Sequence, residues 1–221
     1  MAQPRLADFF SFLGLPRKLR IDMADLEQRY RALSRQFHPD YFYNAPPAER
    51  RGALVKSSYL NDAYRTLKNP IARVEYLLKL EGVAAGGPSG TQERGPSGPQ
   101  EREGSGTKER EGFSRAAPPQ SLLEEVFALN EELDEVREQK ASGAPADTWR
   151  ARLDRARQPI EAKRAEHESQ LQQLSERWDA VADNDTANGD RRTVLEALRD
   201  RILERNYINN LLAGIEKELN A

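Results

Sequence analysis

Three consecutive residues, His38, Pro39 and Asp40, are the first candidates for chemistry in this sequence of 221 residues. Histidine is the commonest general base in enzymes, and a neighbouring aspartate could orient its ring. The same tripeptide could instead be only the end of a helix, because proline stops helices and aspartate favours turns. The sequence around the tripeptide must decide between these interpretations.

Other residues that could support catalysis or bind a metal are scarce. The chain has one further histidine, His167, and no cysteine. Cysteine-ligated zinc and iron–sulfur sites are therefore excluded, and too few other ligands can be placed for a metal site. His167 lies in a helical pattern, so we expect it to be packed or half-exposed. We expect no enzymatic activity, no cofactor and no metal, with a metal-dependent hydrolase using His38 and Asp40 as a rival hypothesis.

The tripeptide separates two predicted helices. The first begins after Asp22, a favourable N-cap, and its apolar residues are spaced by 4, 3 and 4 positions: Leu26, Tyr30, Leu33 and Phe37. Pro39 ends this helix, because proline disfavours the helical conformation at the residue before it. The second helix begins near Pro47, since proline is favoured at the first helical position. Further helices are expected over residues 6–13 and 70–82.

Basic residues gather on the first helix of this pair and on the segment before it. Residues 17–37 hold six basic and three acidic side chains, so their net charge is +3. Arg31 and Arg35 are one turn apart and lie off the apolar face, so both are predicted to face solvent. A solvated, charged helix face is the ordinary interpretation of such a pattern.

A glycine-rich stretch divides the chain. Residues 82–112 hold 9 of the 14 glycines in a loose repeat of Gly, Pro and Ser with Gln-Glu-Arg, and Val83 is their only large apolar residue. This composition cannot bury enough apolar surface to offset the entropy of ordering, and it predicts a flexible linker. We therefore expect one domain over residues 5–82 and another over 118–220, joined by a linker over 83–117.

The second domain is predicted to contain three helices. The first carries a heptad-like seam of Leu122, Val126, Leu129, Leu133 and Val136. The second runs from Trp149 to Val181, with a kink or short break at Pro159. The third extends from Val194 to Leu219, after a turn over residues 183–190. Short connections favour an antiparallel bundle, in which Trp149 and Trp178 are expected to anchor the core.

The composition narrows the classes of partner. The net charge is −2, so no global electrostatic field favours binding to nucleic acid. No apolar run approaches the ~18 residues that a membrane span needs. The first apolar stretch is short and is interrupted by Asp8, unlike a signal peptide. We expect an all-α cytoplasmic protein that binds neither nucleic acid nor membranes.

The order of motifs around the tripeptide resembles a known domain. The segments FFSFLGLP, LEQRYRALSRQFHPD and LNDAYRTLKNPIARVEYLL are together similar to the J domain of DnaJ-type co-chaperones, over about residues 6–81. The resemblance implies that His38, Pro39 and Asp40 lie in the loop between two antiparallel helices. There they would stimulate ATP hydrolysis by a DnaK-type chaperone, with Pro39 fixing the loop geometry. It also implies that Arg31 and Arg35 dock an acidic patch on that chaperone.

The stretch SLLEEVFALNEELDEV, residues 121–136, has a wider apolar strip than a bundle seam needs. Leu123 and Phe127 lie beside the seam, and the strip continues into acidic residues. Periodicity alone favours packing of Leu123 and Phe127 under the third helix. An apolar patch rimmed by acids is the alternative, and such patches mark protein-binding surfaces.

This stretch, following a J domain and the segment NPIARVEYLLKLEG, resembles the HscB family of iron–sulfur cluster co-chaperones. The resemblance implies an N-terminal J domain joined to a C-terminal three-helix bundle. It implies two partners, an HscA/DnaK-type ATPase chaperone and the IscU-type cluster scaffold protein. The scaffold-binding residues carried over by position are Leu123, Phe127, Glu131, Glu135 and Tyr207.

Two further hypotheses stay open at this point. A general J-domain co-chaperone could deliver a different client with the same bundle. A helical scaffold protein could also carry His38-Pro39-Asp40 only as an incidental helix stop.

Overall fold

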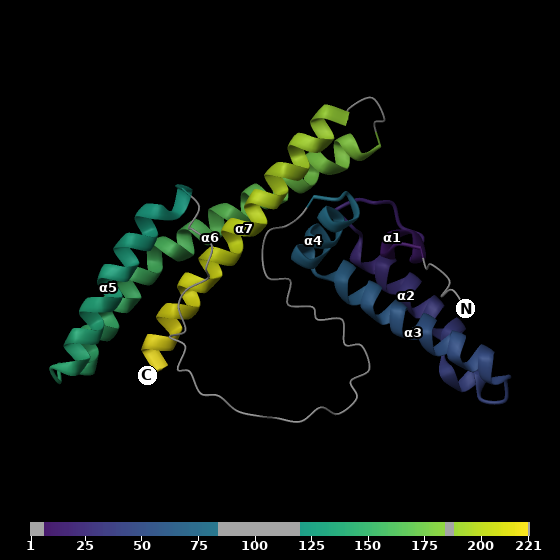
Figure 1. Cartoon of the computed structure of the whole chain (residues 1–221), viewed down its shortest axis with the longest axis horizontal. Helices are drawn as coiled ribbons and strands as arrows, with labels where there is room; N and C mark the ends of the chain where they lie inside the picture. The colour runs from purple at the N-terminus through teal and green to yellow at the C-terminus, as the bar shows by residue number, and fades with distance from the viewer. Residues whose placement is uncertain (1–6, 84–119, 184–187, 221) are drawn as a thin grey trace, which may run out of the picture. The chain divides into compact units, whose positions relative to one another are not determined.

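Every element of regular structure in the described residues is a helix (Figure 1). The structure, a computed structural model, describes residues 7–83, 120–183 and 188–220. The predicted all-α fold is confirmed in these ranges, which contain a helical hairpin and three longer helices. Within the described ranges, no helix is both long and apolar enough to cross a membrane. The linker predicted over 83–117 lies, apart from Val83, outside these ranges and stays a prediction.

The chain divides into two compact units that share its two longest helices, α6 (Ala146–Ala182) and α7 (Asn188–Asn220). The first unit combines Met1–Ala85 with Glu168–Ile202, and the second combines Gly86–His167 with Leu203–Ala221. Composition separates segments along the chain at the glycine-rich stretch. The units instead group residues that contact one another in space, and each takes one part of α6 and one part of α7.

In the first unit, α2 (Met23–Phe37) and α3 (Pro47–Lys68) form an antiparallel hairpin. The Tyr30 ring stacks on Tyr64 with centroids 4.2 Å apart, and the Lys56 ammonium lies 5.3 Å from the Phe37 ring centroid. The middle of α2 thus meets the end of α3, and the end of α2 meets the first half of α3. Apolar side chains of the hairpin and of α1 (Phe9–Phe12) share one core: Phe10, Leu13, Leu26, Leu60, Ala63 and Leu67.

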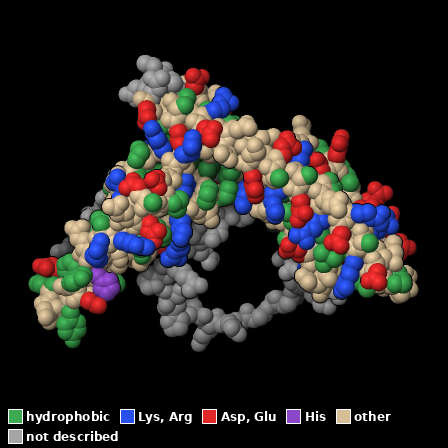
Figure 2. Space-filling view, turned by 180° about the vertical axis from the view of Figure 1, so that it is seen from behind, with side chains coloured by type: hydrophobic (Ala, Val, Ile, Leu, Met, Phe, Trp, Pro, Cys, Tyr) green, Lys and Arg blue, Asp and Glu red, His purple; other side chains and the backbone are tan. Residues whose placement is uncertain are grey.

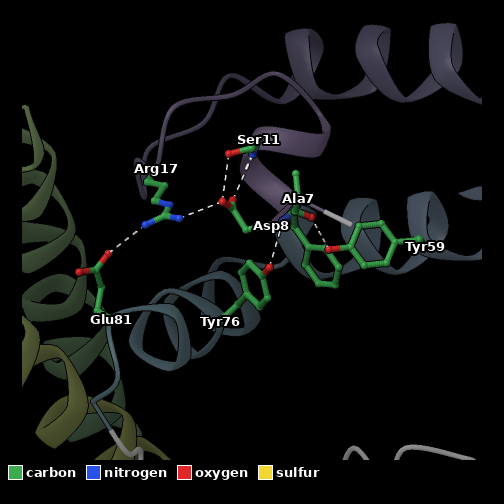
Figure 3. Close-up of polar contacts among 8 residues, drawn as sticks. Ala7, Asp8, Ser11, Arg17, Tyr59, Tyr76 and Glu81 are labelled. Carbon is green, nitrogen blue, oxygen red and sulfur yellow. Dashed lines mark hydrogen bonds and ion pairs between the residues drawn. The ribbon is translucent and has the colours of Figure 1, made fainter. Parts of the chain in front are cut away.

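The helix predicted over residues 6–13 is shorter in the structure, since α1 spans only Phe9–Phe12. The Asp8 carboxylate caps it, accepting from the Ser11 N–H at 3.1 Å and pairing with the Arg17 guanidinium at 2.9 Å (Figure 3). Gly14 has a φ of +67°, and this left-handed conformation favours glycine and ends the turn. The single turn is therefore closed by its own caps at both ends.

Two tyrosines hold α1 in place from α3 and from α4 (Pro70–Leu80). The Tyr59 hydroxyl donates to the Ala7 carbonyl at 2.6 Å, and the Tyr76 hydroxyl accepts from the Phe9 N–H at 2.9 Å (Figure 3). Burial raises the pKa of Tyr59 to about 12. A helix of one turn is not stable alone, so these contacts fix its position.

The first unit also includes the end of α6, which holds the loop before α2. The Asp179 carboxylate accepts from the N–H groups of Leu19 and Arg20, at 2.6 and 2.9 Å. The Trp178 indole N–H donates to the Arg17 carbonyl at 3.0 Å, and the indole is fully buried. The indole belongs to a core cluster whose other buried members come from the loop, α4, α6 and α7. They are Leu19, Val74, Leu77, Leu78, Leu171, Val194, Leu195, Leu198 and Ile202.

The second unit contains α5 (Leu123–Ala141), which follows the short helix η2 (Gln120–Leu122), together with parts of α6 and α7. All members of the predicted seam are buried: Leu122, Val126, Leu129, Leu133 and Val136. Ion pairs of Arg152 with Glu132 and of Lys163 with Glu125 show that α6 runs antiparallel to α5. Contacts from Ser121 to Glu204 and from Arg137 to Glu218 show that α7 runs parallel to α5.

Of the kink or short break predicted at Pro159, the break is absent, because α6 is one continuous helix from Ala146 to Ala182. Proline removes one backbone hydrogen bond and costs about 3 kcal/mol inside a helix. Leu153 and Ile160, on either side of it, are both buried in the core cluster of the second unit. This packing offsets the lost hydrogen bond, and periodicity could not show how firmly both flanks are held.

Candidate functional site

The His38-Pro39-Asp40 tripeptide lies at the tip of the α2–α3 hairpin. His38 ends α2 with extended backbone angles (φ −63°, ψ 129°), as expected before a proline. Pro39 then begins a short 3₁₀ helix, η1 (Pro39–Phe42). The tripeptide therefore stops one helix and starts another in a single step, and the His38 and Asp40 side chains are presented at the turn.

The His38 and Asp40 side chains contact each other, and the His38 ring meets the Tyr41 ring edge-on with centroids 6.2 Å apart. The His38 Nδ1 atom accepts from the Asp40 N–H at 3.3 Å and lies 3.4 Å from the Asp40 Oδ2 atom. The Asp40 side chain is 87% exposed and that of His38 is 50% exposed. Groups this open to water are poorly suited to catalysis within this chain but are free to bond a partner protein.

The tip also carries exposed aromatic side chains that the sequence patterns did not single out. Tyr41 is 74% exposed and Tyr43 is 77% exposed. Lys56 of α3 lies over the Phe37 ring, next to the tripeptide. The signal for Lys56 was available in the sequence, because an antiparallel hairpin places the first half of α3 beside the end of α2. The exposure of the tyrosines depends on the path of η1, which no periodicity gives.

Arg31 and Arg35 both face solvent, and this prediction is confirmed. With Tyr30 and Ser34 they line an open depression on α2. Arg31 pairs with Glu27 at 2.5 Å, whereas Arg35 forms no ion pair with any residue in the described ranges. Of the two guanidinium groups, that of Arg35 is therefore the more available to a partner. Figure 2 shows a face of the molecule on which basic and acidic side chains are interspersed, in keeping with the small net charge.

Arg29, on the same helix, has a structural role. Its guanidinium bonds the Asp25 carboxylate at 2.8 Å and the Gly14 carbonyl at 2.7 Å. These bonds tie the loop after α1 to α2. Arg29 is therefore less available to a partner than its neighbours.

Four of the five predicted scaffold-binding residues form a strip along α5. Leu123, Phe127, Glu131 and Glu135 follow one another at intervals of four residues, so they share one side of the helix. Leu123 is partly buried, but Phe127 is 69% exposed. Packing of Phe127 under the third helix, which periodicity favours, is therefore wrong. We call these four residues the α5 strip.

Tyr207 lies on α7 near the beginning of the α5 strip. Ser121 bonds Glu204, and α7 runs parallel to α5, so Tyr207 lies at the level of the first turn of α5. Tyr207 is partly buried against the core of the second unit. Burial raises the pKa of its hydroxyl. Its position is compatible with a patch that begins at Leu123, and its membership of that patch stays a prediction.

His167, the second histidine, is buried in the bundle, as predicted for a packed residue. It is 3% exposed, and its Nε2 atom lies 3.8 Å from a Glu204 carboxylate oxygen. Across the described ranges, no three His, Cys, Asp or Glu side chains are grouped so that they could hold a metal ion. The hydrolase hypothesis for His38 and Asp40 thus gains no support from this part of the chain.

Comparisons with known proteins agree with this geometry. The DnaJ domain family matches residues 8–76. Curated relatives named co-chaperone protein HscB homolog, from Neisseria meningitidis strains of serogroups C and B, are 46% identical over 86 residues. The matched stretch is 39% of this chain and 52% of those relatives, so the chain spans about half the length of the curated relatives it matches.

Solved structures extend the likeness over the remaining helices. Chaperone HscB from Vibrio cholerae is 25% identical, with a TM-score of 0.55 over 96% of this chain and 96% of its own. Human co-chaperone protein HscB, at 23% identity and a TM-score of 0.54 over 100% of this chain and 87% of its own, shows the shared fold. These findings confirm the predicted J domain joined to a three-helix bundle, and over most of its length the chain is similar to J-domain co-chaperones of the HscB type.

Proposed function

We propose that this chain is a co-chaperone that stimulates ATP hydrolysis by an HscA/DnaK-type chaperone. The observation that carries the proposal is the exposed His38–Asp40 pair at the tip of the α2–α3 hairpin, inside a matched DnaJ domain. An exposed carboxylate can form charge-assisted hydrogen bonds with a partner, and these are stronger than neutral ones. The hydrolysis itself would take place in the partner, and this chain would supply no catalytic group.

The basic side chains on α2 would bring the partner to the tip. Arg31 and Arg35 face solvent close to the tripeptide. Opposite charges across an interface mainly raise the rate of association and fix its orientation. In this proposal an acidic patch on the chaperone meets Arg31 and Arg35, and Asp40 then engages the site that couples binding to hydrolysis.

The α5 strip would bind the second partner, an IscU-type iron–sulfur scaffold protein. Phe127 is the most exposed large apolar side chain described on the bundle helices. Aromatic side chains often contribute most of the binding energy at protein interfaces. One chain that binds both partners raises the effective concentration of one near the other.

Steady-state ATPase measurements test the whole proposal. The chaperone is assayed alone, with this protein, with the scaffold, and with both. The expected result is stimulation by this protein and a further rise when the scaffold is added. Stimulation without any effect or binding of the scaffold at micromolar concentration would favour a general J-domain co-chaperone with another client. Absence of stimulation under all conditions would reject the co-chaperone function.

Reversing the charge at Arg35 should slow association with the chaperone. We expect Arg35→Glu to lower the association rate constant by roughly three- to tenfold at low salt, because it converts attraction into repulsion. The effect should fade as salt rises, since the screening length falls to ~3 Å at 1 M. Stopped-flow association at several salt concentrations measures it.

Arg51→Glu is the matched control for that measurement. Arg51 is exposed on α3 and lies about 200° around the helix from Ala53, which is buried against the core of the first unit. The two variants have the same net charge. If both slowed association equally, the location of Arg35 on α2 would not matter.

Truncation of Phe127 should weaken scaffold binding without unfolding the bundle. Phe127→Ala is expected to reduce affinity by about 10- to 100-fold, the range typical of an interface hot spot. Its effect on the free energy of unfolding should stay within about 0.5 kcal/mol, since the side chain is 69% exposed. Isothermal titration and denaturant unfolding measure the two quantities.

Leu129→Ala, two residues away, should show the opposite pattern, a loss of stability rather than a loss of scaffold affinity. Leu129 is 2% exposed, so its truncation should cost about 2–5 kcal/mol of stability. Unchanged scaffold affinity in Phe127→Ala would remove Phe127 from the proposed patch.

A further inference from the structure

One arginine on α6 holds two carboxylates of α5. The Arg152 Nε atom lies 2.6 Å from a Glu132 carboxylate oxygen, and its Nη2 atom pairs with Glu135. The three side chains are only partly exposed, at 27% for Arg152, 34% for Glu132 and 44% for Glu135. The hydrogen bond from Arg152 lowers the pKa of Glu132, so that carboxylate stays ionised and paired.

Arg152 thereby forms one border of the α5 strip. Successive residues turn by 100° around a helix, so Glu132 points toward α6 and Glu135 lies between that direction and Glu131. The strip therefore runs from Leu123 and Phe127, across Glu131, to Glu135 at the edge where α6 packs. Arg152 reaches this edge from α6 and occupies the end of the strip.

The two acidic members of the strip consequently differ. Glu135 shares its charge with Arg152, whereas Glu131 is exposed and forms no ion pair with any residue in the described ranges. Glu132, Glu135 and Arg152 together carry a net charge of −1, and Glu131 brings the total to −2. Without Arg152 the same region would carry −3.

We propose that Arg152 sets the negative charge that the α5 strip presents to its protein partner, by occupying Glu135 and leaving Glu131 as the available carboxylate. This inference rests on the proposed function, in which the strip binds the scaffold. The surface it fits is a protein face with an apolar side chain for Phe127 and one Lys or Arg for Glu131. A more basic partner would have to compete with Arg152 for Glu135.

Removal of the Arg152 charge tests the inference. Arg152→Gln should raise the association rate constant with a purified IscU-type scaffold by roughly two- to fivefold at low salt, with the gain lost at high salt. Glu135→Gln in the Arg152→Gln background should reverse most of the gain. In the unmodified protein, Glu131→Gln should slow association more than Glu135→Gln does.

Arg192→Gln is the charge-matched control. Arg192 pairs with Glu196 on α7, in the first unit, so this variant also removes one arginine and releases one glutamate. It should leave association with the scaffold close to that of the unmodified protein. Thermal unfolding of both variants checks that each bundle stays folded; if Arg152→Gln does not fold, the comparison of Glu131→Gln with Glu135→Gln decides.

Two readouts that need no scaffold keep the inference separate from the proposed function. Carbon-13 NMR titration should show the Glu132 pKa higher in Arg152→Gln than in the unmodified protein. A hexalysine peptide should shift the backbone amide resonances near Glu135 more strongly in that variant. Failure of the unmodified protein to bind the scaffold would reject the proposed partner alone. Equal responses of the two proteins to hexalysine, or equal association rates with a scaffold that binds, would overturn the role of Arg152.

Discussion

Replacing Asp40 with asparagine is expected to abolish stimulation of the chaperone ATPase while leaving the fold intact. The Asp40 side chain is 87% exposed and contacts the half-exposed His38 ring, so folding gains little from its charge. Asparagine has nearly the same shape but cannot form the charge-assisted hydrogen bonds of a carboxylate. Such bonds contribute about 1.5–3 kcal/mol, which corresponds to roughly a 10- to 150-fold loss in coupling.

Single-turnover ATP hydrolysis by the chaperone, titrated with each variant, measures this loss. Asp62→Asn is the matched control, because Asp62 is an exposed aspartate of α3 whose neighbour is Arg65 at 3.7 Å. It should stimulate hydrolysis like the unmodified protein. Full stimulation by Asp40→Asn would leave the tripeptide as a simple helix stop and would favour the hypothesis of a helical scaffold protein.

The local geometry of the tip could be predicted from the sequence because it depends on neighbouring residues. Asp22 caps α2, the apolar spacing sets its buried face, and Pro39 ends it. These are short-range effects of backbone conformation and helical periodicity. The same reasoning placed Arg31 and Arg35 in solvent. It did not place Tyr41 and Tyr43, because the path of the chain through η1 follows no repeating pattern.

The α5 strip shows where periodicity stops being informative. Leu123 is the member of the α5 strip nearest the seam, and Phe127 lies only about 40° further around the helix. Whether such a residue is buried depends on how closely α7 approaches, which the sequence of α5 does not contain. The structure leaves Phe127 exposed and Leu123 partly buried.

Contacts between distant segments were the least predictable. Trp178 was expected to anchor a bundle core, and it is buried as expected. Its indole, however, donates to the carbonyl of Arg17, which is 161 positions away in the sequence. Periodicity identifies which face of a helix is buried but not which segment covers it. The grouping of Glu168–Ile202 with the first 85 residues follows from contacts of this kind.

Truncation of Trp178 should therefore destabilise the first unit, including the residues around the hairpin. Trp178 is fully buried among residues of α4, α6, α7 and the loop before α2. We expect Trp178→Ala to lower the free energy of unfolding by about 3–5 kcal/mol, from lost burial and the cavity that remains. This is a large part of the 5–15 kcal/mol that typically stabilises a domain, so the residues that the indole covers should open more often.

Each unit contains one of the two tryptophans, Trp149 in the second and Trp178 in the first, so variants of Trp178 test the stability of the first unit. In Trp178→Ala, hydrogen exchange at α4 and at the loop before α2 should accelerate. Trp178→Phe keeps an aromatic ring but loses the hydrogen bond to Arg17, so it should cost about 1–2 kcal/mol. Unchanged exchange at the loop in Trp178→Ala would show that Asp179, rather than the indole, holds this segment. Because Asp179 accepts from two backbone N–H groups of that loop, Asp179→Ala is the variant that would then reproduce the loss.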